Sequence, residues 1–117
     1  MTKDELSKIL HSIKEAAFVA EGEPAIEQKG GYPRIVYWET VWTDHNASGD
    51  DYETTVTYQV SLCDRKPRGR ALIALKKALN AAGLHPVFYH EHVVPTDSPQ
   101  YFHSYCAIDV EEDLDNG

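Results

Sequence analysis

Apolar and polar residues alternate most regularly between residues 52 and 62 of this chain. A period of two in a segment rich in Val, Thr and Tyr predicts a strand with one buried face. We expect this strand to organise the fold, because a hairpin partner can precede it and a helix can follow it. The side chains predicted to face the core are those at even positions: Tyr52, Val56, Tyr58, Val60 and Leu62.

Two other stretches carry apolar residues at helical spacing. At the amino end, Thr2 and Glu5 have the spacing of a capping box, which marks a helix start. The stripe that follows predicts an amphipathic helix from residue 3 to about residue 20. A second stripe predicts a helix over residues 67–82, which Gly83 would end. The residues of the two stripes are Leu6, Ile9, Leu10, Ile13 and Ala17, then Leu72, Leu75, Ala78, Leu79 and Ala82.

The remaining segments alternate between strand and loop patterns. Residues 34–42 are apolar at both parities, which predicts a strand covered on both faces. Residues 43–51 are rich in Asn, Ser, Gly and Asp, so we predict an exposed loop there. Residues 84–94 and 101–110 predict two further strands. The short segment 25–28, between glycines and prolines, fits either an edge strand or a loop.

These elements predict an α+β fold in the order α-β-β-α-β-β. We expect a single-domain sandwich over residues 1–117, because the length suits one domain and no linker or repeat interrupts it. Its sheet would be mostly antiparallel, four-stranded or slightly larger, with two helices packed on one face. The acidic C-terminal tail, from about residue 112 to 117, is predicted to be disordered.

Charge and cysteine content narrow the class of protein. The net charge of −8 argues against sequence-independent DNA binding, which depends on Lys and Arg. Cys63 and Cys106 lack a CxxC spacing, which favours buried free thiols, with a disulfide between adjacent strands as the alternative. No apolar run approaches membrane-spanning length and no signal segment opens the chain. We therefore expect a protein made in the cytoplasm with no membrane partner.

Two groups of residues offer the side-chain types of a catalytic or metal site. The sequence His-Glu-His at 90–92 places two imidazoles on one face of a strand, but a metal needs three or four converging ligands. Asp44, His45 and Ser48 supply the residue types of a hydrolase triad, on a segment predicted to lack rigid support. The pattern therefore predicts no catalytic residue, no metal and no other cofactor.

A basic cluster lies where the strand at 52–62 leads into the second helix. It consists of Arg65, Lys66, Arg68 and Arg70. The cluster fits a solvated helix start, an inter-subunit salt-bridge patch, or a contact with DNA in a channel. Positive charge at a helix start opposes the helix dipole, which points to a use elsewhere.

Several segments together resemble the small tail-completion, or tail-terminator, proteins of siphophages and prophages of Gram-positive bacteria. The resemblance is a pattern of elements over roughly residues 32–111. The segments that carry it are Pro-Arg-Ile-Val-Tyr-Trp at 33–38, Asp-Tyr-Glu at 51–53, Thr-Tyr-Gln-Val-Ser-Leu-Cys at 57–63, Ala-Leu-Lys-Lys-Ala-Leu at 74–79, Gly-Leu at 83–84 and Tyr-Phe-His-Ser-Tyr-Cys-Ala-Ile at 101–108.

The resemblance implies a structural role without a catalytic site. The members of this family are α+β subunits of a homo-oligomeric ring, typically a hexamer, in the tail or neck of the virion. Such a ring caps the tail tube, stops its polymerisation and contacts the head connector, or stopper, protein. DNA would only pass through the lumen, and an acidic chain agrees with that because it repels the phosphate backbone.

Aromatic, loop and basic positions supply the contact residues that we predict for such an assembly. Two alternatives stay open: a head-to-tail adaptor or other neck protein of the same virion, and an acidic inhibitor or immunity-type module that binds a basic enzyme. The predicted contact residues are Trp38, Trp42, Asp44, His45, Asn46, Asp50, Asp51, Arg65, Arg68, Arg70, Tyr101 and Tyr105.

Overall fold

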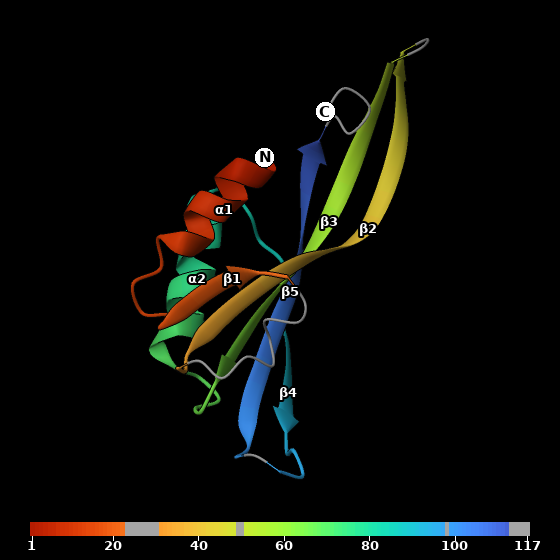
Figure 1. Ribbon diagram of the computed structural model, residues 1–117. Helices are drawn as coiled ribbons and strands as arrows, with labels where there is room; N and C mark the ends of the chain where they lie inside the picture. Colours follow the sequence, from red (N-terminus) through yellow and green to blue (C-terminus); the bar gives the residue numbers. More distant parts are fainter. Residues whose placement is uncertain (23–30, 49–50, 98, 113–117) are drawn as a thin grey trace.

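A five-stranded mixed sheet forms the centre of the molecule (Figure 1). The computed structural model describes residues 1–22, 31–48, 51–97 and 99–112. For residues 46–48 and 51–53 it describes only the backbone. The strand order is β1-β2-β3-β5-β4. β1 runs parallel to β2, and the other pairs are antiparallel. The strands are β1 Phe18–Glu21, β2 Arg34–Ser48, β3 Asp51–Asp64, β4 Tyr89–Val93 and β5 Tyr101–Glu112.

Two helices, α1 Lys3–His11 and α2 Arg70–Ala81, cover one face of this sheet (Figure 1). The start of α1 has the predicted cap, in which the Thr2 hydroxyl accepts a hydrogen bond from the Glu5 N–H at 3.2 Å. Burial of the apolar stripes against the sheet stabilises both helices. The core residues without exposed surface include Leu6, Leu10, Leu75 and Leu79 of the helices and Val56, Val60 and Val110 of the sheet.

The strand predicted over residues 52–62 is confirmed as part of β3, with β2 and β5 as its neighbours. From Val56 to Leu62 the even positions are buried against the helices. Thr55, Thr57 and Gln59 are partly exposed on the other face. Ser61 is fully buried on that second face, which the alternating pattern did not predict.

The first helix is shorter than predicted, and a strand replaces its second half. The Ser12 N–H bonds the Lys8 and Ile9 carbonyls, and the Ser12 hydroxyl bonds Ile9 O at 2.6 Å, which ends α1 at His11. Phe18–Glu21 then pairs in parallel with β2. The α+β class is therefore confirmed. The predicted order α-β-β-α-β-β is corrected to α-β-β-β-α-β-β. The sheet, predicted to be mostly antiparallel with four strands or slightly more, has five strands and is mixed, because β1 pairs in parallel with β2.

The prediction of an exposed loop over residues 43–51 is also wrong for 43–48 and 51, which belong to strands, while 49–50 lie outside the described residues. Residues 43–48 continue β2, and they pair with β3 up to the register Ser48–Asp51. We call residues 39–48 of β2 and 51–57 of β3 the arm, because in Figure 1 this hairpin projects beyond the helices. The polar composition that predicted a loop instead belongs to a stretch of β2 whose side chains are exposed on both faces from Val41 to His45.

Other boundaries moved by a few residues. α2 begins at Arg70 instead of residue 67, and β4 is confined to Tyr89–Val93 within the predicted 84–94. β5 extends to Glu112, so the tail predicted to be disordered begins inside a strand, while 113–117 lie outside the described residues. The predicted edge segment 25–28 also lies outside them.

Both cysteines are buried free thiols, as predicted. Burial raises the pKa of Cys106 to about 12. Burial also raises the pKa of Cys63, against the opposing effect of the Arg34 guanidinium. Among the described residues, no helix is long and apolar enough to cross a membrane.

Candidate assembly surface

The arm has a free edge along β2. β1 pairs with β2 only as far as Tyr37, so from Trp38 to Ser48 the described part of the chain supplies no strand on the edge of β2 that faces away from β3. On the other side of the arm, β5 accompanies β3 only as far as Thr54, opposite Glu112. An uncovered edge strand presents unpaired N–H and C=O groups, which natural monomers usually protect.

Two large apolar side chains of the arm lie in solvent. Val41 is 51% exposed and Trp42 is 61% exposed. A bulge between Glu39 and Val41 shifts the register, so Glu39 and Trp42 fall on the same side of the sheet as the helices, beyond the surface that the helices cover. The Trp42 indole Nε1–H donates to Glu39 Oε2 at 3.1 Å, which satisfies its one polar atom.

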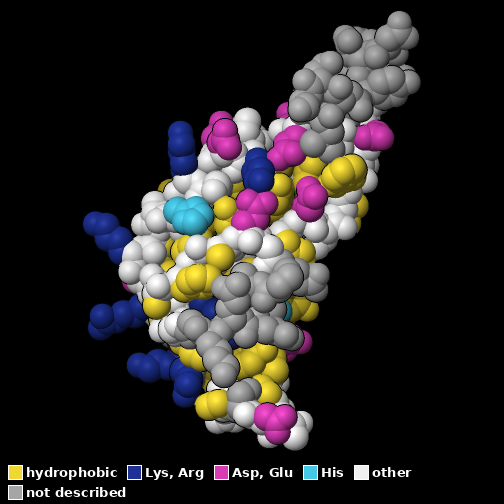
Figure 2. All heavy atoms as spheres, in the orientation of Figure 1, with side chains coloured by type: hydrophobic (Ala, Val, Ile, Leu, Met, Phe, Trp, Pro, Cys, Tyr) yellow, Lys and Arg dark blue, Asp and Glu magenta, His cyan; other side chains and the backbone are white. Residues whose placement is uncertain are grey.

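Carboxylates gather where the arm leaves the body (Figure 2). Lys3 lies among them and pairs with Glu21 at 3.0 Å, and the hydrogen bond to Glu21 raises the pKa of Lys3. Burial, followed by the charge of Glu112, raises the pKa of Tyr58 to about 12. We call this group the acidic patch; it comprises Glu21, Glu39, Asp44 and Glu112.

Positive charge is concentrated elsewhere, at the start of α2. An open groove there is lined by Arg68, Arg70 and Lys77, with Glu15 as the one acidic residue of its lining. Ala74 and Ile73, which is 38% exposed, also line it. We call this surface the basic groove. Figure 2 shows Lys and Arg side chains along the side of the molecule away from the arm.

The structure divides the predicted contact residues among three places and does not bring them together. Trp42, Asp44 and His45 lie exposed on the arm, while Arg65, Arg68 and Arg70 are exposed at the other end. The backbones of Asn46 and Asp51 belong to the arm, but their side chains and the whole of Asp50 lie outside the described residues. Trp38, Tyr101 and Tyr105 are half-buried on the sheet face opposite the helices.

That opposite face carries aromatic contacts of its own. Tyr105 stacks on Tyr89, with ring centroids 5.5 Å apart. Tyr101 lies 6.1 Å from Tyr32, and the Arg65 guanidinium lies 5.1 Å above the Tyr32 ring. The basic cluster is thus anchored partly by cation–π contact to this face.

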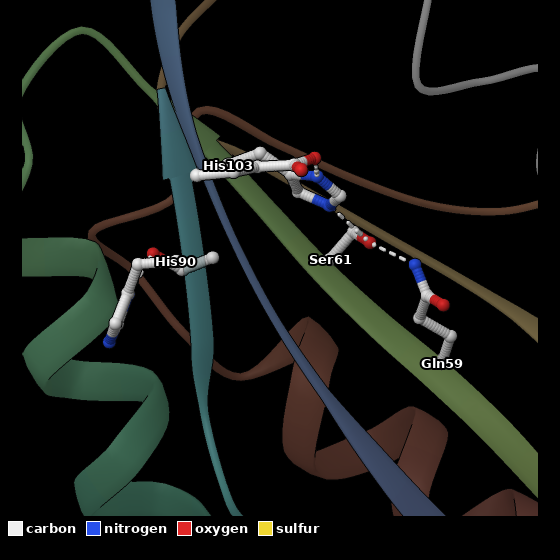
Figure 3. Close-up of polar contacts among 6 residues, drawn as sticks. Gln59, Ser61, His90 and His103 are labelled. Carbon is white, nitrogen blue, oxygen red and sulfur yellow. Dashed lines mark hydrogen bonds and ion pairs between the residues drawn. The ribbon is translucent and has the colours of Figure 1, made fainter. Parts of the chain in front are cut away.

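A polar network that the sequence did not reveal joins three strands on the same face (Figure 3). His103 Nδ1 lies 2.7 Å from Glu91 Oε1, and His103 Nε2 lies 2.8 Å from Ser61 Oγ. Gln59 Nε2 donates to Ser61 Oγ at 3.1 Å. Ser, His and carboxylate are connected in the order of a hydrolytic triad. Only the strand register, with Glu91 and Cys63 opposite His103, brings these distant residues together.

The surroundings of Ser61 favour a structural role for this network. Ser61 is fully buried and His103 is 8% exposed. Ser61 lies in the central strand, paired on both sides, so the N–H groups around it belong to the sheet ladder and do not form an oxyanion hole. Its hydroxyl already receives the Gln59 amide. The network therefore satisfies buried polar atoms between strands.

The histidine and loop residues considered for chemistry do not converge. His90 bonds Ser104 at 2.7 Å, while His92 bonds Gln100 at 2.9 Å and stacks on Phe102. Asp44 and His45 point to opposite faces of the arm, where they bond Thr54 and Thr55. The part of the chain that the structure describes holds no group of three metal-ligating side chains.

Comparison with known proteins does not indicate a function for this chain. No protein-family model matches the chain, and no curated protein is significantly similar to it.

Proposed function

We propose that this chain is a structural assembly protein that completes a phage tail. It would form a homo-oligomeric ring, typically of six copies, on the tail tube, stop tube polymerisation and offer a face to the head connector. The observation that carries the proposal is the arm, with its free β2 edge and its exposed Val41 and Trp42.

The β2 part of the arm contributes little to the core of its own chain. Val56 of β3 is fully buried, whereas its neighbour across the pair, Trp42, is 61% exposed. Free edges and exposed aromatic side chains expose a monomer to aggregation and are typical of contact surfaces. Contact with another chain explains both features, as expected for an assembly subunit.

The negative charge of the chain supports a ring whose lumen lets DNA pass without binding it. The chain carries a net charge of −8. Carboxylates facing a lumen would repel the phosphate backbone and let DNA slide through. This agrees with a place in the tail or neck of a virion.

Polymerisation of purified tail-tube protein tests the proposal. Tubes grown with the chain should have a narrow length distribution and extra density at one end, whereas tubes grown without it should be longer and variable. Trp42→Ala should lose this effect, and Val87→Ala, which removes another exposed apolar side chain away from the arm, should keep it. Unchanged tube lengths would refute the proposal, and binding to connector protein alone would favour the adaptor.

A further inference from the structure

We infer that the arm of one copy docks into the basic groove of a second copy, with Trp42 packed against Ile73. This inference rests on the proposed ring and names its subunit contact. The occupant of the groove is thus a second molecule of this chain.

The two surfaces lie too far apart to meet within one molecule. The chain is elongated, with extents of 53 × 30 × 21 Å. In Figure 1 the arm projects from one end, whereas the start of α2 lies towards the opposite end. A contact between them must therefore come from different copies.

The two surfaces match in charge and in apolar content. On the arm, the exposed Trp42 is flanked by the carboxylates of Glu39 and Asp44. In the groove, the exposed Ile73 is flanked by Arg70 and Lys77. A central apolar anchor with a charged rim is the usual arrangement of an interface. The indole N–H is already bonded to Glu39, so its burial leaves no polar atom unpaired.

The charge pattern also selects the symmetry. A two-fold contact between arms would place Glu39 and Asp44 against the same carboxylates of the other copy, and the repulsion disfavours it. Arm-to-groove contact joins different surfaces at opposite ends, so each copy accepts one neighbour and contacts another. Such a heterologous contact generates a ring when the rotation closes.

Charge reversal on each side provides the test. In one variant Glu39→Lys and Asp44→Lys make the arm basic, and in the other Arg70→Glu and Lys77→Glu make the groove acidic. Each alone opposes like charges, so its self-association, measured by sedimentation and native mass spectrometry, should weaken by about tenfold or more. An equimolar mixture of the two variants, or all four changes in one chain, restores the pairing and should recover wild-type association.

Matched controls separate this contact from general charge effects. Lys8→Glu with Lys76→Glu changes the net charge as the groove variant does, on exposed residues outside the groove, and should associate like the wild type. Trp42→Ala removes the apolar anchor and should raise the dissociation constant by about 30-fold. Circular dichroism checks that each variant is folded.

Three results would overturn the inference: a wild-type chain that stays monomeric at millimolar concentration, reversal variants that associate normally, or a mixture no better than its components. Failure here is distinct from failure of the proposed function. Tubes that still stop growing with the reversal variants would refute the contact alone. Association that follows the charges while tube length is unaffected would refute the tail-completion role alone.

Discussion

Replacing Ser61 by Ala tests whether the Ser61–His103–Glu91 network is structural. The substitution removes the hydroxyl that bonds His103 Nε2 at 2.8 Å and accepts from Gln59 at 3.1 Å. Ser61 is fully buried, so the ring nitrogen loses its partner in a place that water does not reach freely. Leaving a buried polar atom unpaired costs about 1–3 kcal/mol.

The same loss can be expressed as a melting temperature. An unfolding entropy of about 2.1 cal/mol/K per residue gives about 0.25 kcal/mol/K for a domain of this size, so the cost corresponds to roughly 4–12 °C. Calorimetry or urea unfolding measures it. Ser104→Ala is the matched control, because its partner His90 is exposed and can bond water instead, at a cost of about 0.5–1.5 kcal/mol.

Two results would contradict this reasoning. Ser61→Ala could prove no more destabilising than Ser104→Ala, which would mean that the network does not stabilise the fold. Alternatively, the wild-type chain could hydrolyse activated esters and lose that activity in Ser61→Ala at unchanged stability, which would make the network catalytic.

Three further predictions concern the arm, an ionisable core residue and the start of α2. Leu75→Ala, at a fully buried position, should lower the free energy of unfolding by about 2–5 kcal/mol, whereas Trp42→Ala should change it by less than about 0.5 kcal/mol. Urea titration measures both values, and equal losses would mean that Trp42 belongs to the hydrophobic core. In an absorbance titration of the folded chain, the Tyr58 hydroxyl should ionise near pH 12 instead of at its ordinary pKa of 10.0. Because folding raises this pKa, the contribution of Tyr58 to the free energy of unfolding is fully present below pH 10.0 and is lost as pH rises through 12. Ionisation at the ordinary pKa would refute the burial of Tyr58. Gly69→Ala should lower the melting temperature, because a Cβ there would collide with the Asp64 carboxylate. Gly83→Ala should also lower it, because the positive φ of 84° strains a residue with a side chain even though no atom lies in the way. An unchanged melting temperature for Gly69→Ala would mean that the Asp64 side chain moves aside at no cost.

The sequence predicted best the elements whose burial is regular and local. The alternation from Val56 to Leu62 follows directly from one face packed on helices, and the stripe of α2 follows from its buried Leu72, Leu75 and Leu79. β1 was missed because its four residues gain their structure from pairing with β2 and not from a pattern of their own. Ile13 and Ala17 continued the helical spacing past the point where Ser12 ends α1.

The arm and the polar network depend on contacts across strands, which composition does not show. Asp44 and His45 suggest a loop by residue type, yet hydrogen bonds to Thr54 and Thr55 hold them in a strand. The predicted contact residues follow from residue type and predicted element, so the sequence could nominate Trp42 and Arg70 but not show that they lie at opposite ends. Ile73 and Lys77 were missed because they lie in the second helix outside its apolar stripe, on its exposed side, where the sequence has no pattern that marks a contact.

Arrest of growing tail tubes is the measurement that tests the tail-completion role most directly. Purified tube protein is set to polymerise, the chain is added at a chosen time in an amount far below that of the tube protein, and lengths are followed by electron microscopy. If the chain completes tails, tubes should stop at the length reached at the time of addition, each with a ring at one end. Growth that continues at the same rate, with no ring, would contradict it.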